Sequence, residues 1–283
     1  MAQPTLFPES GFRRLRIDIA YDGTAFFGWA AQPDRRTIQD LVEEAIARIS
    51  RGDVESVVAG RTDAGVHATG QVIHVDLPDA VFADGLTYID LRYKLNRILD
   101  EDVRIMEISD APVGFHARFS ALRRIYTYKI LDNNDVIPPL SRYDVAPWYR
   151  PLDADLMNKA SELVLGHNDF AAFCKFKEGG TTIRTLEKYQ WHREETGLLV
   201  AEVVADAFCY SMVRNLVGAV VCVADGRKDP SWMAELLANK ERVSDSLVFP
   251  ARGLSLTRVE YPTNDQLIER AKVTIGKRGD GSH

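Results

Sequence analysis

One arginine and one aspartate, Arg61 and Asp63, stand in the glycine-flanked stretch Ala59–His67 of a 283-residue chain. Apolar, strand-like runs precede and follow this stretch, at 54–59 and 71–76, so it is expected to form a loop. A guanidinium beside a carboxylate keeps the carboxylate ionised, which is the state that a catalytic nucleophile or base needs. The other interpretation is a hairpin turn with a surface ion pair.

Aromatic and basic residues gather in a second motif, Phe115–Ser120, which runs into an expected strand at 123–131. Alternate residues of a strand share a face, so Arg124 and Tyr126 should point to the same side of the sheet. An aromatic ring beside a guanidinium suits a base and its phosphate. A cross-strand pair that only supports the sheet is the alternative, and it is more credible for Tyr128 alone than for both tyrosines.

A third candidate, Arg214, opens a mostly apolar helix that is expected over 210–225. The helix dipole disfavours a cation at this end, and a charge next to a buried stretch needs a partner. An arginine that only snorkels to solvent is the alternative. The stretch Tyr21–Trp29 adds aromatic rings among turn residues, and of these Phe26 and Trp29 are expected to fill the core.

The composition, 46% hydrophobic and 27% charged, is that of a globular protein. The net charge of −6 is unusual for a nucleic-acid binder, which would then depend on a locally basic face. Cys174, Cys209 and Cys222 form no C-x-x-C pair, which predicts a reducing compartment and no zinc or disulfide framework. No apolar run has membrane-spanning length and no signal peptide is visible, so a cytoplasmic location is expected.

The expected elements follow the order β-α-β-β-α-β twice. This order indicates an α+β fold of two ferredoxin-like (split βαβ, RRM-like) halves, with antiparallel sheets and a catalytic cleft between them. We expect an N-terminal domain over 1–110 that carries the Asp63 loop, a C-terminal domain over 111–262 that completes the RNA cleft, and a flexible tail over 263–283. Helices are expected at 38–49, 85–99, 154–165, 210–225 and from 231, and strands at 15–21, 54–59, 71–76, 103–108, 123–131, 182–193, 198–205 and 254–261.

Together these motifs resemble the TruA family of tRNA pseudouridine synthases over roughly residues 14–262. Gly60–His67 is similar to the catalytic motif of that family residue for residue. Two positions depart from the family pattern: Ala30 stands where glutamine is usual and Ser211 where histidine is common. The other matching blocks, in the same order, are Tyr21–Thr24, Gly28-Trp29, Phe115–Ser120, Arg124, Tyr126 and Met212–Asn215.

The resemblance implies a cytoplasmic, homodimeric isomerase that converts uridine to pseudouridine at positions 38, 39 and 40 of the tRNA anticodon stem-loop. It implies no cofactor, no metal and no membrane partner. Asp63 is implied as the essential carboxylate, and whether it attacks C1′ or removes the 2′ proton stays open. Arg61 and Arg214 would position Asp63 and keep it charged. Tyr126 would stack on the flipped base, and Arg124 would help to bind the substrate.

Two other function classes remain to be separated from this one. A non-catalytic RNA-binding protein built from duplicated RRM-like modules would explain the topology and the aromatic residues, but it gives no reason for Asp63. A metal-assisted hydrolase using Asp63, His67 and His116 would explain the acid, but these residues lack the spacing of metal ligands.

Overall fold

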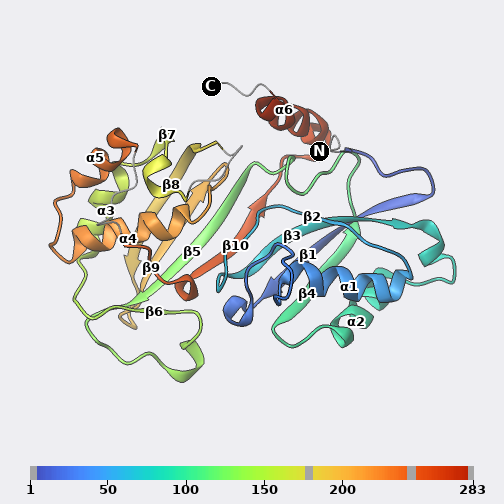
Figure 1. Cartoon of the computed structure of the whole chain (residues 1–283), viewed down its shortest axis with the longest axis horizontal. Helices are drawn as coiled ribbons and strands as arrows, with labels where there is room; N and C mark the ends of the chain where they lie inside the picture. The colour runs from blue at the N-terminus through green and yellow to red at the C-terminus, as the bar shows by residue number, and fades with distance from the viewer. Residues whose placement is uncertain (1–4, 176–180, 241–246, 280–283) are drawn as a thin grey trace. The chain divides into compact units, whose positions relative to one another are not determined.

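The protein is represented by a computed structural model, which describes residues 5–175, 181–240 and 247–279. The chain divides into two compact units (Figure 1). Residues 1–122 and 258–283 form the first unit, and residues 123–257 form the second.

In the described part of the first unit, antiparallel strands follow the order β4-β1-β3-β2. The expected alternation in β1 is confirmed, because Leu15, Ile17 and Ile19 are buried. Two helices follow threonine caps and lie side by side (Figure 1). The chain order is β1 (Phe12–Tyr21), η1 (Gly23–Ala25), α1 (Ile38–Ser50), β2 (Ser56–Val58), β3 (His67–Pro78), η2 (Asp79–Phe82), α2 (Tyr88–Ile98) and β4 (Val103–Asp110).

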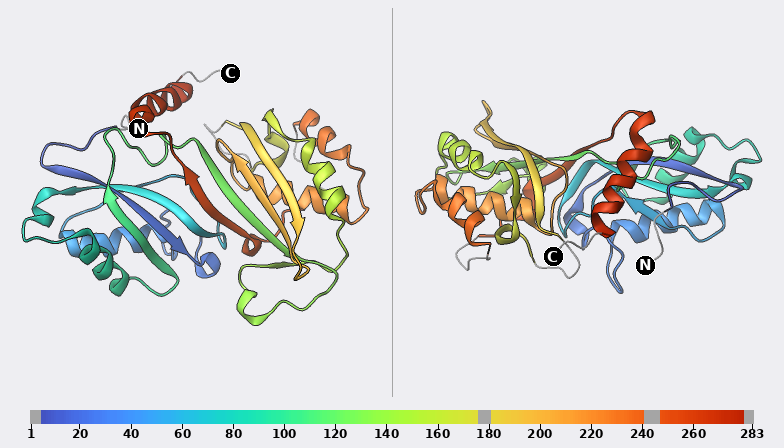
Figure 2. Two further views of the ribbon diagram at one scale, coloured as in Figure 1. Left: turned by 180° about the vertical axis from the view of Figure 1, so that it is seen from behind. Right: turned by 90° about the horizontal axis from the view of Figure 1, so that it is seen from above.

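The second unit contains antiparallel strands in the order β5-β9-β8-β7, and the short β6 runs parallel to β5. The helices of its described residues lie together, as Figure 2 shows from two further sides. The strands β6 and β7 were not predicted, because two to four residues carry no periodic pattern. The chain order is β5 (Arg123–Leu131), η3 (Pro139–Ser141), β6 (Ala146–Pro147), α3 (Ala154–Glu162), β7 (Gly166–Asp169), η4 (Ala171–Phe173), β8 (Ile183–Arg193), β9 (Leu199–Ala205), α4 (Met212–Ala224), α5 (Trp232–Asn239) and η5 (Ala251–Gly253).

The strand β10 (Leu254–Glu260) crosses the division of the chain, and its residues 254–257 belong to the second unit. There it lies beside β5, where Thr257 Oγ1 donates a hydrogen bond of 3.1 Å to the carbonyl oxygen of Ile125.

Helix α4 forms the centre of the second unit. Every residue of α4 except Arg214 is buried. A Cβ atom on Gly218 would lie 1.5 Å from the carbonyl oxygen of Leu247, so only glycine lets this helix pass the neighbouring backbone. Among the helices of the described ranges, this one included, none has both the length and the apolar character needed to cross a bilayer.

The observed boundary between the units differs from the predicted one at 110/111, and the tail predicted over 263–283 is not simply frayed. Residue Phe115 belongs with the first unit, where its carbonyl oxygen accepts a hydrogen bond of 3.0 Å from Arg14 Nη1. After η6 (Asn264–Gln266), the chain forms α6 (Leu267–Gly279), whose Ile268 side chain packs on Gly114. These contacts are tertiary, and no local pattern in the sequence announces them.

The expectation that no cysteines are paired is wrong in this structure. Cys174 and Cys209 form a disulfide, with their Cα atoms 5.8 Å apart, while Cys222 is free and buried. The pairing joins residues 35 positions apart. Folding brings them together, and neither residue belongs to the short-range motif on which the prediction relied.

Candidate active site

The loop between β2 and β3 carries Asp63, and it is fastened on both sides to the segment that follows η1. The backbone N–H of Trp29 donates to the carbonyl oxygen of Thr62 at 3.0 Å, and the N–H of Gly65 donates to the carbonyl oxygen of Phe26 at 3.2 Å. These two bonds lie on either side of Asp63. Its peptide is therefore held in place from both directions.

Two glycines of the segment 21–29 allow this close approach. A Cβ atom on Gly28 would lie 2.8 Å from the carbonyl oxygen of Thr62, and Gly28 also has a positive φ of 97°. A Cβ atom on Gly23 would lie 2.0 Å from the carbonyl oxygen of Val66. The turn is thus built on backbone contact, while Phe26 and Trp29 fill the core as expected.

A network of buried polar side chains also holds the Asp63 loop in place. The hydroxyl groups of Tyr21 and Thr62 are 2.7 Å apart. The side-chain N–H groups of Gln71 donate to the Tyr21 oxygen at 3.2 Å and to the carbonyl oxygen of Gly60 at 2.8 Å. Burial raises the pKa of Tyr21 to about 12, so its hydroxyl stays protonated within this network. Sequence reasoning missed Gln71, whose only signal was an amide at the start of an apolar run.

The two charged residues of the loop differ in exposure. Asp63 is half-buried and Arg61 is exposed. Within the described part of the chain, no hydrogen bond or ion pair joins the Arg61 guanidinium to the Asp63 carboxylate. The expected pair between these neighbours is therefore not formed, because the loop directs Arg61 to solvent.

The two histidines of the metal-hydrolase alternative both accept backbone hydrogen bonds. His67 Nδ1 accepts from the N–H of Gly23 at 3.0 Å, and His116 Nδ1 accepts from the N–H of Phe119 at 3.2 Å. Over residues 5–175, 181–240 and 247–279, no group of three or more histidine, cysteine, aspartate or glutamate side chains could hold a metal ion. Both rings fix turns.

The motif Phe115–Ser120 rests on a pair of buried histidines in the first unit. The rings of His74 and His116 lie 4.8 Å apart, and His74 Nδ1 accepts a hydrogen bond of 3.0 Å from the N–H of Ala117. Burial, followed by the positive charge of Arg14, lowers the pKa of His74 to about 2 and that of His116 to about 4. Both rings are therefore neutral at physiological pH.

In the second unit, β5 presents Arg124 and Tyr126, which are 8% and 7% exposed. Arg124 Nη1 donates to the carbonyl oxygen of Asp206 at 2.7 Å. The ring of Tyr126 meets the ring of Phe208 edge to face, with centroids 5.1 Å apart. Both side chains are held in fixed positions. Both are also more buried than is expected of side chains that bind a ligand at the protein surface.

Arg214 lies near the start of α4 and is half-buried. Its Nε donates to the carbonyl oxygen of Phe249 at 2.8 Å, and the N–H of Phe249 donates back to the carbonyl oxygen of Arg214 at 3.1 Å. The preceding Ser211 has a positive φ of 62°, a conformation in which asparagine, aspartate and histidine are favoured. The sequence predicts a partner for the charge of Arg214, and the carbonyl oxygen of Phe249 is one such partner.

The predicted site residues therefore form two sets, one in each unit. Asp63 and Arg61 share one loop of the first unit. Arg124, Tyr126 and Arg214 belong to the second unit.

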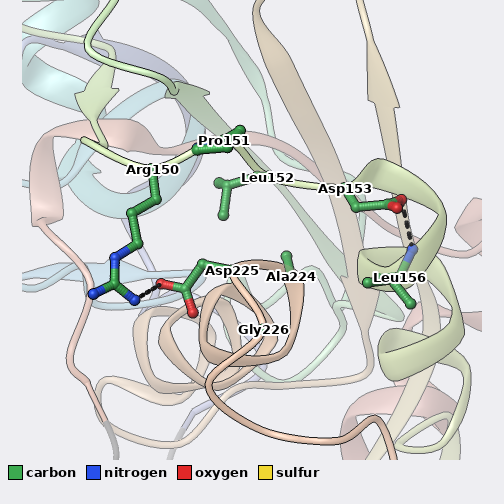
Figure 3. Close-up of a pocket in the computed structure, with 8 residues that line it drawn as sticks. All are labelled: Arg150, Pro151, Leu152, Asp153, Leu156, Ala224, Asp225 and Gly226. Carbon is green, nitrogen blue, oxygen red and sulfur yellow. Dashed lines mark hydrogen bonds and ion pairs between the residues drawn. The ribbon is translucent and has the colours of Figure 1, made fainter.

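A pocket of about 580 Å³ in the second unit involves none of these residues (Figure 3). It lies at the other end of α4 from Arg214, about 15 Å along the helix axis. The carboxylate of Asp225 is wholly buried and lies 2.8 Å from Arg227 and 3.8 Å from Arg150. We interpret this pocket as a structural feature at the end of α4, where ion pairs to Asp225 stabilise the fold. Its lining residues are Arg150–Asp153, Leu156 and Ala224–Gly226.

Comparison with known proteins assigns the family. A family model described as tRNA pseudouridine synthase matches residues 19–120 and 160–262. The tRNA pseudouridine synthase A of Frankia casuarinae is 51% identical over 269 residues, which cover 95% of this chain and 96% of the relative. The proteins of the same name from Streptomyces griseus and Mycobacterium leprae are 50% and 47% identical, and the matches cover 93% and 92% of this chain and 93% and 94% of those relatives. The chain belongs to the family of tRNA pseudouridine synthases.

Proposed function

We propose that this protein isomerises uridine to pseudouridine at positions 38, 39 and 40 of the tRNA anticodon stem-loop, with Asp63 as the catalytic carboxylate. The observation that carries the proposal is a single half-buried carboxylate in a loop whose backbone is fastened on both sides. Family membership supports the reaction, and the match of Gly60–His67 to the catalytic motif supports the residue.

The reaction exchanges one glycosidic bond for another without any net gain or loss of atoms. The N1–C1′ bond breaks, the uracil rotates, C5 bonds to C1′, and the proton lost from C5 is balanced by one gained at N1. Asp63 can attack C1′ or remove the 2′ proton, and both routes need an ionised carboxylate close to the ribose.

The other predicted residues take supporting roles in this proposal. Tyr126 stacks on the flipped base and assists the loss of the C5 proton, because its ring has a fixed orientation against Phe208. Arg214 keeps the carboxylate charged, and Arg124 orients the substrate from the same strand as Tyr126. Arg61 contacts the RNA backbone, because its guanidinium is exposed.

We further propose a cytoplasmic homodimer with two ferredoxin-like units in each chain. The strand order β4-β1-β3-β2 of the first unit supports this fold assignment. Despite the net charge of −6, the affinity for tRNA should fall steeply with salt, because phosphate contacts release counterions. Light scattering should give twice the chain mass, and a filter-binding series should give a log–log slope of several units. A monomeric mass or a flat series would contradict the dimer or the basic face.

Tritium release tests the reaction itself. Anticodon stem-loops with tritium at C5 of each uridine should lose tritium at positions 38, 39 and 40 when the protein is added, with or without a chelator. Transcripts with cytidine at these positions are the control. Binding without release would indicate the non-catalytic RNA-binding alternative, and release that stops with chelator would indicate metal-assisted chemistry.

A further inference from the structure

An exposed aromatic ring lies beside the Asp63 loop and has no part in the roles assigned so far. The side chain of Phe27 is 48% exposed. The guanidinium carbon of Arg35 lies 4.4 Å from the centre of its ring. The ring and the guanidinium together expose an aromatic surface and a positive charge beside the Asp63 loop.

Phe27 is placed next to Asp63 by the backbone. It lies between Phe26 and Trp29, the two residues whose peptide groups bond to Gly65 and Thr62 on either side of Asp63. The adjacent residue, Gly28, is so close that a Cβ atom there would lie 3.2 Å from the carbonyl carbon of Asp63. The backbone of Phe27 therefore belongs to the same hydrogen-bonded segment that holds the Asp63 loop.

The segment that carries Phe27 and Arg35 is also fixed. The N–H of Phe27 donates to the carbonyl oxygen of Arg36 at 3.0 Å, and Gln32 Nε2 donates to the carbonyl oxygen of Phe27 at 2.9 Å. Arg36 in turn forms ion pairs of 2.7 Å with Asp100 and Asp102. The exposed ring therefore stands on a segment held by hydrogen bonds and ion pairs.

The neighbouring pair gives an internal contrast. Arg36 lies 4.0 Å from the ring centre of Phe26, but that ring is 3% exposed and that arginine is neutralised by two carboxylates. Arg35, by comparison, is exposed and forms no ion pair within the described residues. One ring–guanidinium pair closes the core, and the other presents an aromatic surface and a positive charge to solvent.

We propose that Phe27 and Arg35 form a stacking platform for an unpaired RNA base that neighbours the target uridine, with Arg35 contacting the phosphate of that nucleotide. The proposal rests on the proposed function, because the ligand chemistry is that of single-stranded RNA. Aromatic faces bind bases of any sequence, and a guanidinium binds phosphate. The platform is a positioning surface and takes no part in the bond exchange.

Binding of a uridine-containing anticodon stem-loop to the Asp63→Asn form tests the platform without turnover. In that background, Phe27→Leu should weaken binding between about 5- and 150-fold, because base stacking is lost while an apolar side chain remains. Phe27→Trp should retain the affinity. Tyr93→Leu is the matched control, since Tyr93 is 63% exposed on α2 and has Arg97 5.8 Å from its ring centre. Equal effects of Phe27→Leu and Tyr93→Leu would overturn the proposal.

An abasic scan identifies the base that stacks. Removal of that one base should weaken binding to the protein with Phe27 but not to the Phe27→Leu variant. If, at every position, the losses from base removal and from Phe27→Leu simply add, the proposal is overturned. Arg35→Gln should lower the slope of log affinity against log salt concentration by about one, because one phosphate contact is lost. An unchanged slope would show that Arg35 does not contact the phosphate. If the parent protein releases tritium and Phe27→Leu binds normally, only the platform fails. If the parent releases none, the proposed function fails first.

Discussion

The Asp63 loop of the first unit and the β5–α4 region of the second unit secure their residues in different ways. Around Asp63, the bonds that fix the loop are made by backbone groups of its neighbours and by the Tyr21–Thr62 hydroxyl pair. In the second unit, the side chains proposed for substrate binding and catalysis are themselves held, Arg124 and Arg214 by backbone carbonyl groups and Tyr126 by an aromatic ring. The first region fixes the backbone that carries the proposed catalytic carboxylate, and the second fixes the side chains that are proposed to meet the substrate.

The sharpest test of this difference is Asp63→Asn. We expect a loss of at least about 10³-fold in tritium release, because asparagine is nearly isosteric but can act neither as nucleophile nor as base. Binding of the stem-loop should change little, since the backbone of the loop holds its shape. Turnover close to that of the parent, after deamidation has been excluded by mass spectrometry, would end the assignment of Asp63.

Tyr126 should give a smaller effect that divides into two parts. Tyr126→Ala should reduce binding by roughly 1–3 kcal/mol for the lost stacking, and it should also lower stability because the ring is buried against Phe208. Tyr126→Phe should keep the stacking and the packing, so any remaining loss of rate reports on the hydroxyl group. If Tyr126→Ala lowers only the melting temperature, the ring is a core residue and the second region is not a recognition surface.

Several features of both regions could be predicted from the sequence, and the reasons for the others are physical. The Asp63 motif and the order of elements are local patterns, and periodicity and turn residues predict both. The burial of Arg14 and the helix α6 depend on contacts between residues far apart in the chain. The Gln71 network was missed because a single amide in a strand gives no periodic signal, although it supports the very loop that the motif identified.

Acid should destabilise the first unit at a higher pH than the second unit. His74 and His116 have lowered pKa values in the folded first unit, so below pH 6.5 the unfolded chain binds protons that the folded chain does not. Their stabilising contribution is complete above pH 6.5 and falls by about 1.4 kcal/mol per pH unit for each ring as the pH drops towards 4.

The second unit provides the internal control for this pH effect. Burial opposes the ionisation of Asp132, but hydrogen bonds from Arg193 and from the N–H of Leu152 outweigh it and lower the pKa of the carboxyl group. The stability that ionised Asp132 contributes is present above the ordinary pKa of an aspartate. It is lost only as the pH falls through the lowered pKa of Asp132 in the folded protein. Hydrogen exchange resolved by peptide should therefore show protection falling around Ala117 between pH 6.5 and 5, while peptides near Asp132 keep theirs. His116→Gln should reduce the fall in the first unit, and an unchanged fall would exclude the histidine pair as its cause.

The smallest effect should come from Tyr21→Phe, which removes one hydroxyl from beneath the Asp63 loop. Gln71 keeps its bond to the Gly60 carbonyl, but the bonds of the Tyr21 oxygen with Thr62 and Gln71 are both lost, so the cost should be that of two neutral hydrogen bonds, about 1–3 kcal/mol of unfolding free energy. If the network positions Asp63 as well as stabilising the fold, the rate of tritium release should fall a few-fold below that of the parent at full tRNA saturation, where weaker binding has no influence. A stability loss of the same size with an unchanged saturated rate would show that the backbone bonds of Trp29 and Gly65 suffice to place the carboxylate, and the contrast between the two regions would then rest on those bonds alone.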